Sequence, residues 1–152
     1  MNILDSKILG SVEPNIEFAA LPSMILCDEA VWPEPNEFRP YSFFSMPVFF
    51  VEAVCDVTNT WWFFDTYKFL QYSTPERIHG FSAELISLSG KVAAARISGF
   101  DRAMYLYDTS LLPEEMRNVQ NLKCDMVHTL LHLGGLVNRV AQEQKCLAIV
   151  GV

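Results

Sequence analysis

The fold is decided by residues 47–72, which read PVFFVEAVCDVTNTWWFFDTYKFLQY. Between Val48 and Thr58, a fully apolar row of side chains alternates with a mixed row, as on the two faces of a strand. β-favouring residues return after the turn sequence Thr58-Asn59-Thr60. This pattern predicts a long antiparallel hairpin over about residues 47–70. A helix is the competing interpretation, because short apolar runs fit either period.

The same stretch concentrates the aromatic residues of the chain. Thirteen of the nineteen lie between Phe38 and Tyr72, and four are consecutive: Trp61, Trp62, Phe63 and Phe64. Four rings in a row occupy both faces of a strand or most of the circumference of a helix, so two surfaces must cover them. One is the core of the chain itself, and aromatic residues also form the buried centres of protein interfaces. We therefore expect these four residues to bind a partner, with burial in the chain's own core as the alternative.

The N-terminal third is rich in proline. Six of the eight prolines fall between Pro14 and Pro47, too closely spaced for long regular elements. This spacing predicts an extended arm over residues 1–46, with a short strand near residues 24–31, that wraps a core domain over residues 47–152.

Two helices are predicted in the core domain. Thr74 caps the first, Pro75 suits its first turn, and apolar residues at spacings of three and four extend it over residues 75–88, where Gly90 stops it. A second hairpin is expected over residues 91–98 and 102–108. Pro113 opens a final helix over residues 113–144, whose apolar seam is Val119, Leu122, Met126, Leu130, Leu133, Val137 and Val140.

These elements combine into one α+β domain with an antiparallel sheet and helices packed on it. Residues 146–150 are apolar and are expected to close the sheet as its last strand. Gly134 and Gly135 interrupt the final helix pattern, so they either break the helix or let another backbone approach it closely.

Composition excludes several classes of protein. Apolar residues make up 51% of the 152 residues and charged residues 19%, which is typical of a folded domain. The most apolar window contains Glu52 and Asp56, and the N-terminus lacks a signal-like pattern, so we expect a cytoplasmic protein with no membrane span. The four scattered cysteines are expected to be small buried hydrophobic residues.

Charge is distributed unevenly. Residues 1–66 carry a net charge of −8 and residues 67–152 a net charge of +1. No basic patch for a phosphate backbone is present, so we expect no direct binding to nucleic acid. The acidic side chains, with Glu34 and Glu37 as candidates, either keep the aromatic segment soluble or steer the protein onto a basic partner.

Candidate chemical sites are few. His128 and His132 stand four residues apart, the spacing at which two histidines of one helix can chelate a metal, and His79 is the third histidine of the chain. Their competing interpretation is as solvated or hydrogen-bonded side chains of a polar face. Ser82 lies in a segment that lacks the second glycine of a nucleophile elbow. We therefore predict no catalytic residues and no cofactor.

The sequence thus favours a non-catalytic protein-binding protein, such as an inhibitor, immunity protein, chaperone or adaptor, that occupies a partner's surface. A homo-oligomer or an obligate complex is expected, because the aromatic run and the seam offer more apolar surface than one small sheet covers. The alternatives are a structural subunit of a larger assembly, such as a viral particle, and a small metalloprotein built on the histidines.

Overall fold

The computed structural model describes residues 15–22, 39–60, 69–72, 74–108 and 118–151. These residues form the expected α+β domain, in which four antiparallel strands make a sheet in the order β2-β1-β4-β3. The strands are β1 (Asn15–Leu21), β2 (Ser42–Pro47), β3 (Phe69–Tyr72) and β4 (Cys146–Gly151). The helices are η1 (Arg39–Tyr41), α3 (Val48–Thr58), α4 (Pro75–Ala94), η2 (Ile97–Phe100), α5 (Asp101–Asp108) and α6 (Val119–Gln142).

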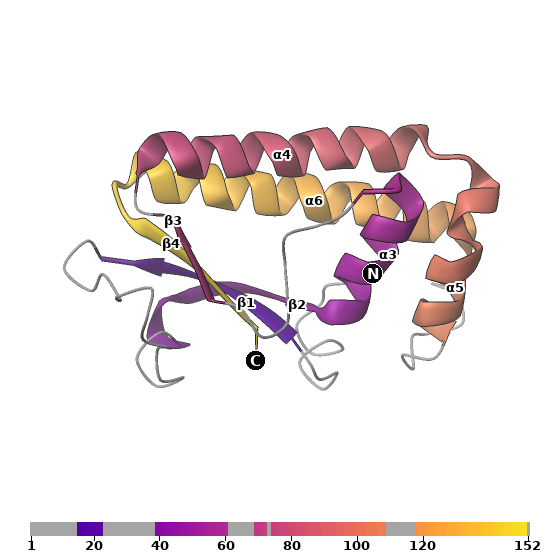
Figure 1. Cartoon of the computed structure of the whole chain (residues 1–152), viewed down its shortest axis with the longest axis horizontal. Helices are drawn as coiled ribbons and strands as arrows, with labels where there is room; N and C mark the ends of the chain where they lie inside the picture. Colours follow the sequence, from indigo (N-terminus) through magenta and orange to yellow (C-terminus); the bar gives the residue numbers. More distant parts are fainter. Residues whose placement is uncertain (1–14, 23–38, 61–68, 73, 109–117, 152) are drawn as a thin grey trace.

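Helices α4 and α6 lie side by side over one face of the sheet (Figure 1). The core between them is centred on Phe18 of β1, which pairs with Phe44 of β2 and Ile149 of β4. The Phe18 ring stacks on Phe81 of α4 at a centroid distance of 6.4 Å and meets Phe44 edge-on at 6.0 Å. This aromatic contact ties the sheet to α4.

The described part of residues 1–46 belongs to the sheet itself. β1 lies between β2 and β4, and its Ile16 and Phe18 are buried under the helices. Pro14 and Pro22 flank β1 in the sequence, and Pro47 is the last residue of β2. These three prolines thus stand at or next to the ends of short strands, where a missing backbone donor costs little.

Residues 48–58 are a helix, so the hairpin predicted over residues 47–70 is wrong in its first half. Phe50, Val54 and Val57 are buried at spacings of four and three, whereas Glu52 and Asp56 are exposed four residues apart. This spacing is the period of a helix. The same residues also alternate between an apolar and a mixed row, and their β-branched valines favour a strand, which is why the sequence suggested one. The predicted turn is instead the helix end, because Asn59 has a φ of 51° and caps α3 in the left-handed conformation.

Residues 91–108 are also helical, so the second predicted hairpin is wrong. α4 continues past Gly90 to Ala94, since Gly90 is exposed and helix propensity alone does not stop a packed helix. η2 and α5 follow directly. Ala93 and Ala94 form the end of α4, and alanine has the highest helix propensity of all residues.

The final helix and the last strand are confirmed. α6 begins at Val119, where Asn118 caps it by accepting from Gln120 N–H at 2.8 Å, and residues 113–117 lie outside the described residues. Its predicted seam faces α4 and the sheet, with every member from Leu122 to Val140 buried. The helix is continuous through both glycines.

Gly134 is the point where α4 and α6 approach closely. The Ser82 hydroxyl of α4 donates to the Gly134 carbonyl at 2.8 Å, and a side chain at position 134 would lie 3.2 Å from Ile86 Cγ1. Gly135 is exposed, with open space around it. Of the two alternatives weighed for the glycine pair, the close approach holds for Gly134.

The second face of the sheet carries its own apolar cluster. Ala19 and Leu21 of β1 pair with Ala148 and Cys146 of β4, and all four side chains are buried, with Tyr41 packed against them. None of the described helices has an apolar stretch long enough to cross a membrane.

Candidate protein-binding surface

The residues predicted to bind a partner lie outside the described part of the chain. They are Trp61, Trp62, Phe63 and Phe64, within residues 61–68, and Glu34 and Glu37, within residues 23–38. Their role stays a prediction. The acidic N-terminal part also includes Glu52 and Asp56 of α3, which the structure does describe.

α3 has a buried side and an acidic side. Phe50 and Val54 are fully buried, whereas Glu52 and Asp56 are exposed. Residues four apart share one side of a helix, so the two carboxylates are neighbours at the surface, and like charges at this spacing destabilise a helix by about 0.2–0.5 kcal/mol.

η2 and α5 expose apolar side chains at the same end of the molecule. Phe100 and Ala103 are fully buried and hold the segment on the core. Ile97 and Tyr105 are 66% and 67% exposed, the largest exposed fractions among the large hydrophobic side chains of the described residues. Covering such a side chain is worth about 1.5–3 kcal/mol, so this segment favours a partner that buries them.

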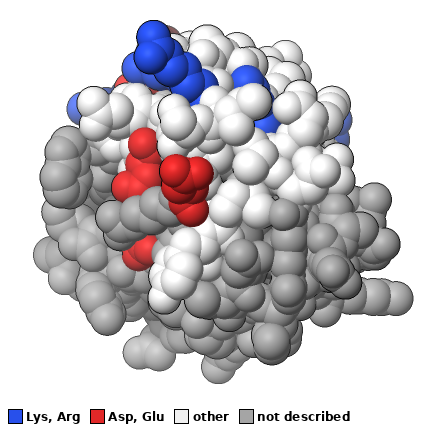
Figure 2. Space-filling model, turned by 90° about the vertical axis from the view of Figure 1, so that its right-hand side faces the viewer, with Lys and Arg blue, Asp and Glu red and all other residues white. Residues whose placement is uncertain are grey.

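α3 packs against α5 and η2, which places the acidic and the apolar residues at one end of the molecule. Asp101, at the start of α5, is exposed and lies four residues before Tyr105, on the same side of the helix. The surface made by Glu52, Asp56, Ile97, Asp101 and Tyr105 is called the acidic end below. Figure 2 looks at this end of the molecule and shows acidic side chains gathered on it, while the Lys and Arg side chains that the structure describes lie in its upper part.

The acidic end has the composition of a protein interface: a few apolar side chains beside charged ones. Carboxylates accept hydrogen bonds from Arg and Lys, and a Tyr ring also attracts a guanidinium over its face. The arrangement is therefore suited to a segment that combines basic and apolar side chains.

The three histidines of the chain lie on α4 and α6. His79 Nδ1 lies 2.6 Å from Asn138 Oδ1, which links α4 to α6, and the His132 ring lies 6.2 Å from the Phe44 ring. His128 and His132 are exposed on α6. Within the described part of the chain, no three His, Cys, Asp or Glu side chains are placed to share an ion.

The cysteines differ from one another in burial. Cys146 is buried on β4, as predicted, Cys55 is half-buried, and Cys27 lies outside the described residues. Cys124 is exposed on α6, which corrects the prediction for this residue, because it lies on the side of the helix away from the seam. Burial raises the pKa of the Cys146 thiol above its ordinary value of 9.0.

The sequence did contain a signal for the acidic end. The spacing of Glu52 and Asp56, four apart and interleaved with buried positions, is that of an exposed helix side. Ile97 and Tyr105 carried no such signal, since an apolar residue in a short segment gives no indication of which side it faces.

Comparison of the chain with protein-family models, with curated protein sequences and with solved structures gave no match. The function is therefore argued from this chain's own surface.

Proposed function

We propose that this protein is a non-catalytic protein-binding protein that holds a basic partner on its acidic end. The observation that carries the proposal is the coincidence, at one end of the molecule, of exposed Glu52, Asp56 and Asp101 with the exposed Ile97 and Tyr105. The net charge of −7 on the whole chain acts in the same direction.

The two kinds of side chain have different tasks in binding. Carboxylates on the surface attract a basic partner from a distance and raise the association rate, an effect that salt screens beyond about 8 Å at physiological ionic strength. Ile97 and Tyr105 act after contact, because burying apolar area slows dissociation. The proposed partner therefore presents Arg or Lys around an apolar centre.

A capture experiment with a matched pair of variants tests the location of the interface. Ile97→Ala and Ile86→Ala make the same truncation at exposed isoleucines, one in η2 at the acidic end and the other on α4. The wild-type protein, immobilised and exposed to extract of its native host, should retain a basic protein that Ile86→Ala also retains. Ile97→Ala and Tyr105→Ala should retain markedly less of it.

The outcomes separate the proposal from its rivals. Equal retention by Ile97→Ala and Ile86→Ala would place any interface away from the acidic end. Retention of an acidic or neutral protein would contradict the proposed role of the carboxylates.

A further inference from the structure

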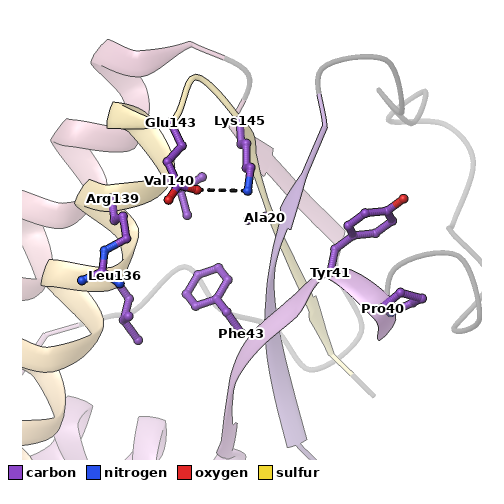
Figure 3. Close-up of a pocket in the computed structure, with 9 residues that line it drawn as sticks. All are labelled: Ala20, Pro40, Tyr41, Phe43, Leu136, Arg139, Val140, Glu143 and Lys145. Carbon is purple, nitrogen blue, oxygen red and sulfur yellow. Dashed lines mark ion pairs between the residues drawn. The ribbon is translucent and has the colours of Figure 1, made fainter.

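A pocket lies between the C-terminal part of α6 and the strands β1 and β2. Its volume is about 300 Å³, which is close to the lower limit for small-molecule sites. Figure 3 shows the ring of Phe43 pointing from the β2 side toward α6, where Leu136 and Val140 complete an apolar wall. The interior of the pocket therefore suits a compact apolar group.

The rim of the pocket is polar on the α6 side. Arg139 and Glu143 project from the end of α6, and Lys145 from the turn that follows it. Lys145 Nζ lies 3.0 Å from Glu143 Oε2, with both side chains nearly half exposed. Ion pairs of such exposure are weak and exchange partners readily.

Arg139 provides the excess positive charge. Within the described part of the chain, its guanidinium makes no ion pair, so the pocket carries two cations against one carboxylate. A guanidinium binds a carboxylate through two parallel hydrogen bonds. A local positive charge on a chain of net charge −7 favours an anion at this site over the rest of the surface.

The end of α6 fixes this rim. Gln144 has a φ of 56°, Lys145 N–H donates to the Val140 carbonyl at 3.1 Å, and Gln144 N–H donates to the Ala141 carbonyl at 3.1 Å. This pair of hydrogen bonds is a Schellman motif. It turns the chain toward β4, and its two hydrogen bonds satisfy the carbonyls of Val140 and Ala141 at the negative end of the helix.

We propose that this pocket binds a small carboxylic acid with an apolar body. Arg139 and Lys145 bind the carboxylate, and the apolar body packs on Phe43, Leu136 and Val140. The site stands apart from the acidic end, because it is built at the opposite end of α6. The competing role of Arg139, complementing the negative end of the helix dipole, needs no ligand.

Titration of isotope-labelled full-length protein with 3-phenylpropionate, hexanoate and 3-phenylpropionamide, followed by NMR, tests the proposal. The two acids should bind with millimolar or lower Kd and shift the amide signals of Ala20, Arg139 and Lys145. The uncharged amide should bind at least about tenfold more weakly, because its single neutral carbonyl oxygen cannot form the bidentate ion pair that a carboxylate forms with a guanidinium. A tetrapeptide ending in phenylalanine presents a carboxylate and an apolar ring at the end of a peptide. If the tetrapeptide binds more tightly than the free acid, the site is assigned to peptide C-termini; if it binds more weakly, the site is assigned to free acids.

Three variants separate ligand binding from helix stabilisation. Arg139→Gln should weaken binding of 3-phenylpropionate by at least about tenfold, and Arg139→Lys, which keeps the charge, by less. Glu143→Gln removes the competing carboxylate and should tighten binding by about fivefold. Thermal melts of the three variants check that each folds.

Four results would overturn the proposal. They are no shift with either acid, equal affinity for the acid and the amide, an unchanged affinity in the folded Arg139→Gln variant, and shifts confined to residues outside the pocket.

Discussion

At the scale of single residues, Gly134 and Gly135 are adjacent in sequence but have opposite environments. Gly134 contacts α4 through the Ser82 hydroxyl and has Ile86 Cγ1 in the way of a side chain, whereas Gly135 faces open space. The sequence located the pair and offered two explanations. It did not decide between them, because the choice depends on which side of α6 meets α4.

We expect Gly135→Ala to raise the free energy of unfolding by about 1 kcal/mol, through helix propensity alone. Gly134→Ala gains the same propensity but has to displace Ile86, so its stabilisation should be smaller or reversed. Urea melts of both variants measure the difference. A larger gain at position 134 than at position 135 would contradict the packing of α4 on α6 at Ser82.

The cysteines allow a test of burial by chemistry. A thiol reacts as the thiolate, and both burial and its raised pKa keep Cys146 protonated and covered. At neutral pH we expect iodoacetamide to label Cys124 quickly and Cys146 only on unfolding, as peptide mass spectrometry would show. Raising the pH toward 9 should still leave Cys146 slow to react, because its burial and its raised pKa both persist in the folded protein. Because the folded-state pKa of Cys146 is raised, its contribution to stability is present below the ordinary pKa and is lost as pH rises above it. Comparable labelling of both residues at neutral pH would show that β4 is accessible.

At the scale of elements, α4 shows how far local signals reach. The cap at Thr74, Pro75 in the first turn and the buried positions Ile78, Phe81 and Leu85 are all as the sequence predicts. The end of the helix was predicted six residues too early, since Gly90 is a stop signal only where packing does not continue the helix.

For α4 we expect Thr74→Ala to cost about 0.5–1 kcal/mol, at the low end for a cap because Arg77 N–H lies 3.4 Å from Thr74 Oγ1. Leu85→Ala should cost about 2–5 kcal/mol, because its fully buried side chain leaves a cavity. Denaturant melts give both values. Similar, small losses in the two variants would place Leu85 outside the core.

α3 and α5 show where sequence reasoning failed. Residues 48–58 fit a strand by β-propensity and a helix by the spacing of Glu52 and Asp56, and tertiary packing decided for the helix. α5 is eight residues long, so its pattern spans about two turns, too few to establish a period. The acidic end is built from these two helices, which explains why the sequence alone could not assemble it.

At the scale of the whole molecule, the apolar seam of α6 is not available for self-association. The seam of α6 was expected to exceed what one small sheet covers, but it is buried within the chain by α4 and the sheet. Among the side chains whose exposure the structure describes, the large exposed hydrophobic ones are Ile86, Ile97, Tyr105 and Leu131. They are candidates for contact with a partner or a second copy.

Light scattering of the purified protein tests the predicted oligomer. The expectation remains a dimer or larger species, and Tyr105→Ala should shift the population toward monomer if the acidic end takes part in self-association. A monomer at high micromolar concentration with no partner would contradict self-association, and only binding to a different protein would remain proposed. Large closed or open assemblies would favour the structural-subunit alternative.

The central claim is that carboxylates at the acidic end guide a basic partner to it. Glu52→Lys and Glu84→Lys change the net charge equally at exposed helix positions, one on α3 and the other on α4. Thermal melts of both variants check that each is folded.

The most direct measurement is therefore the association rate of the captured partner with the wild-type protein and these two variants, at several salt concentrations. We predict that Glu52→Lys lowers the rate several-fold more than Glu84→Lys at low salt, and that the difference shrinks as salt screens the charges. Equal rates for the two variants, or a difference that salt does not reduce, would contradict the account.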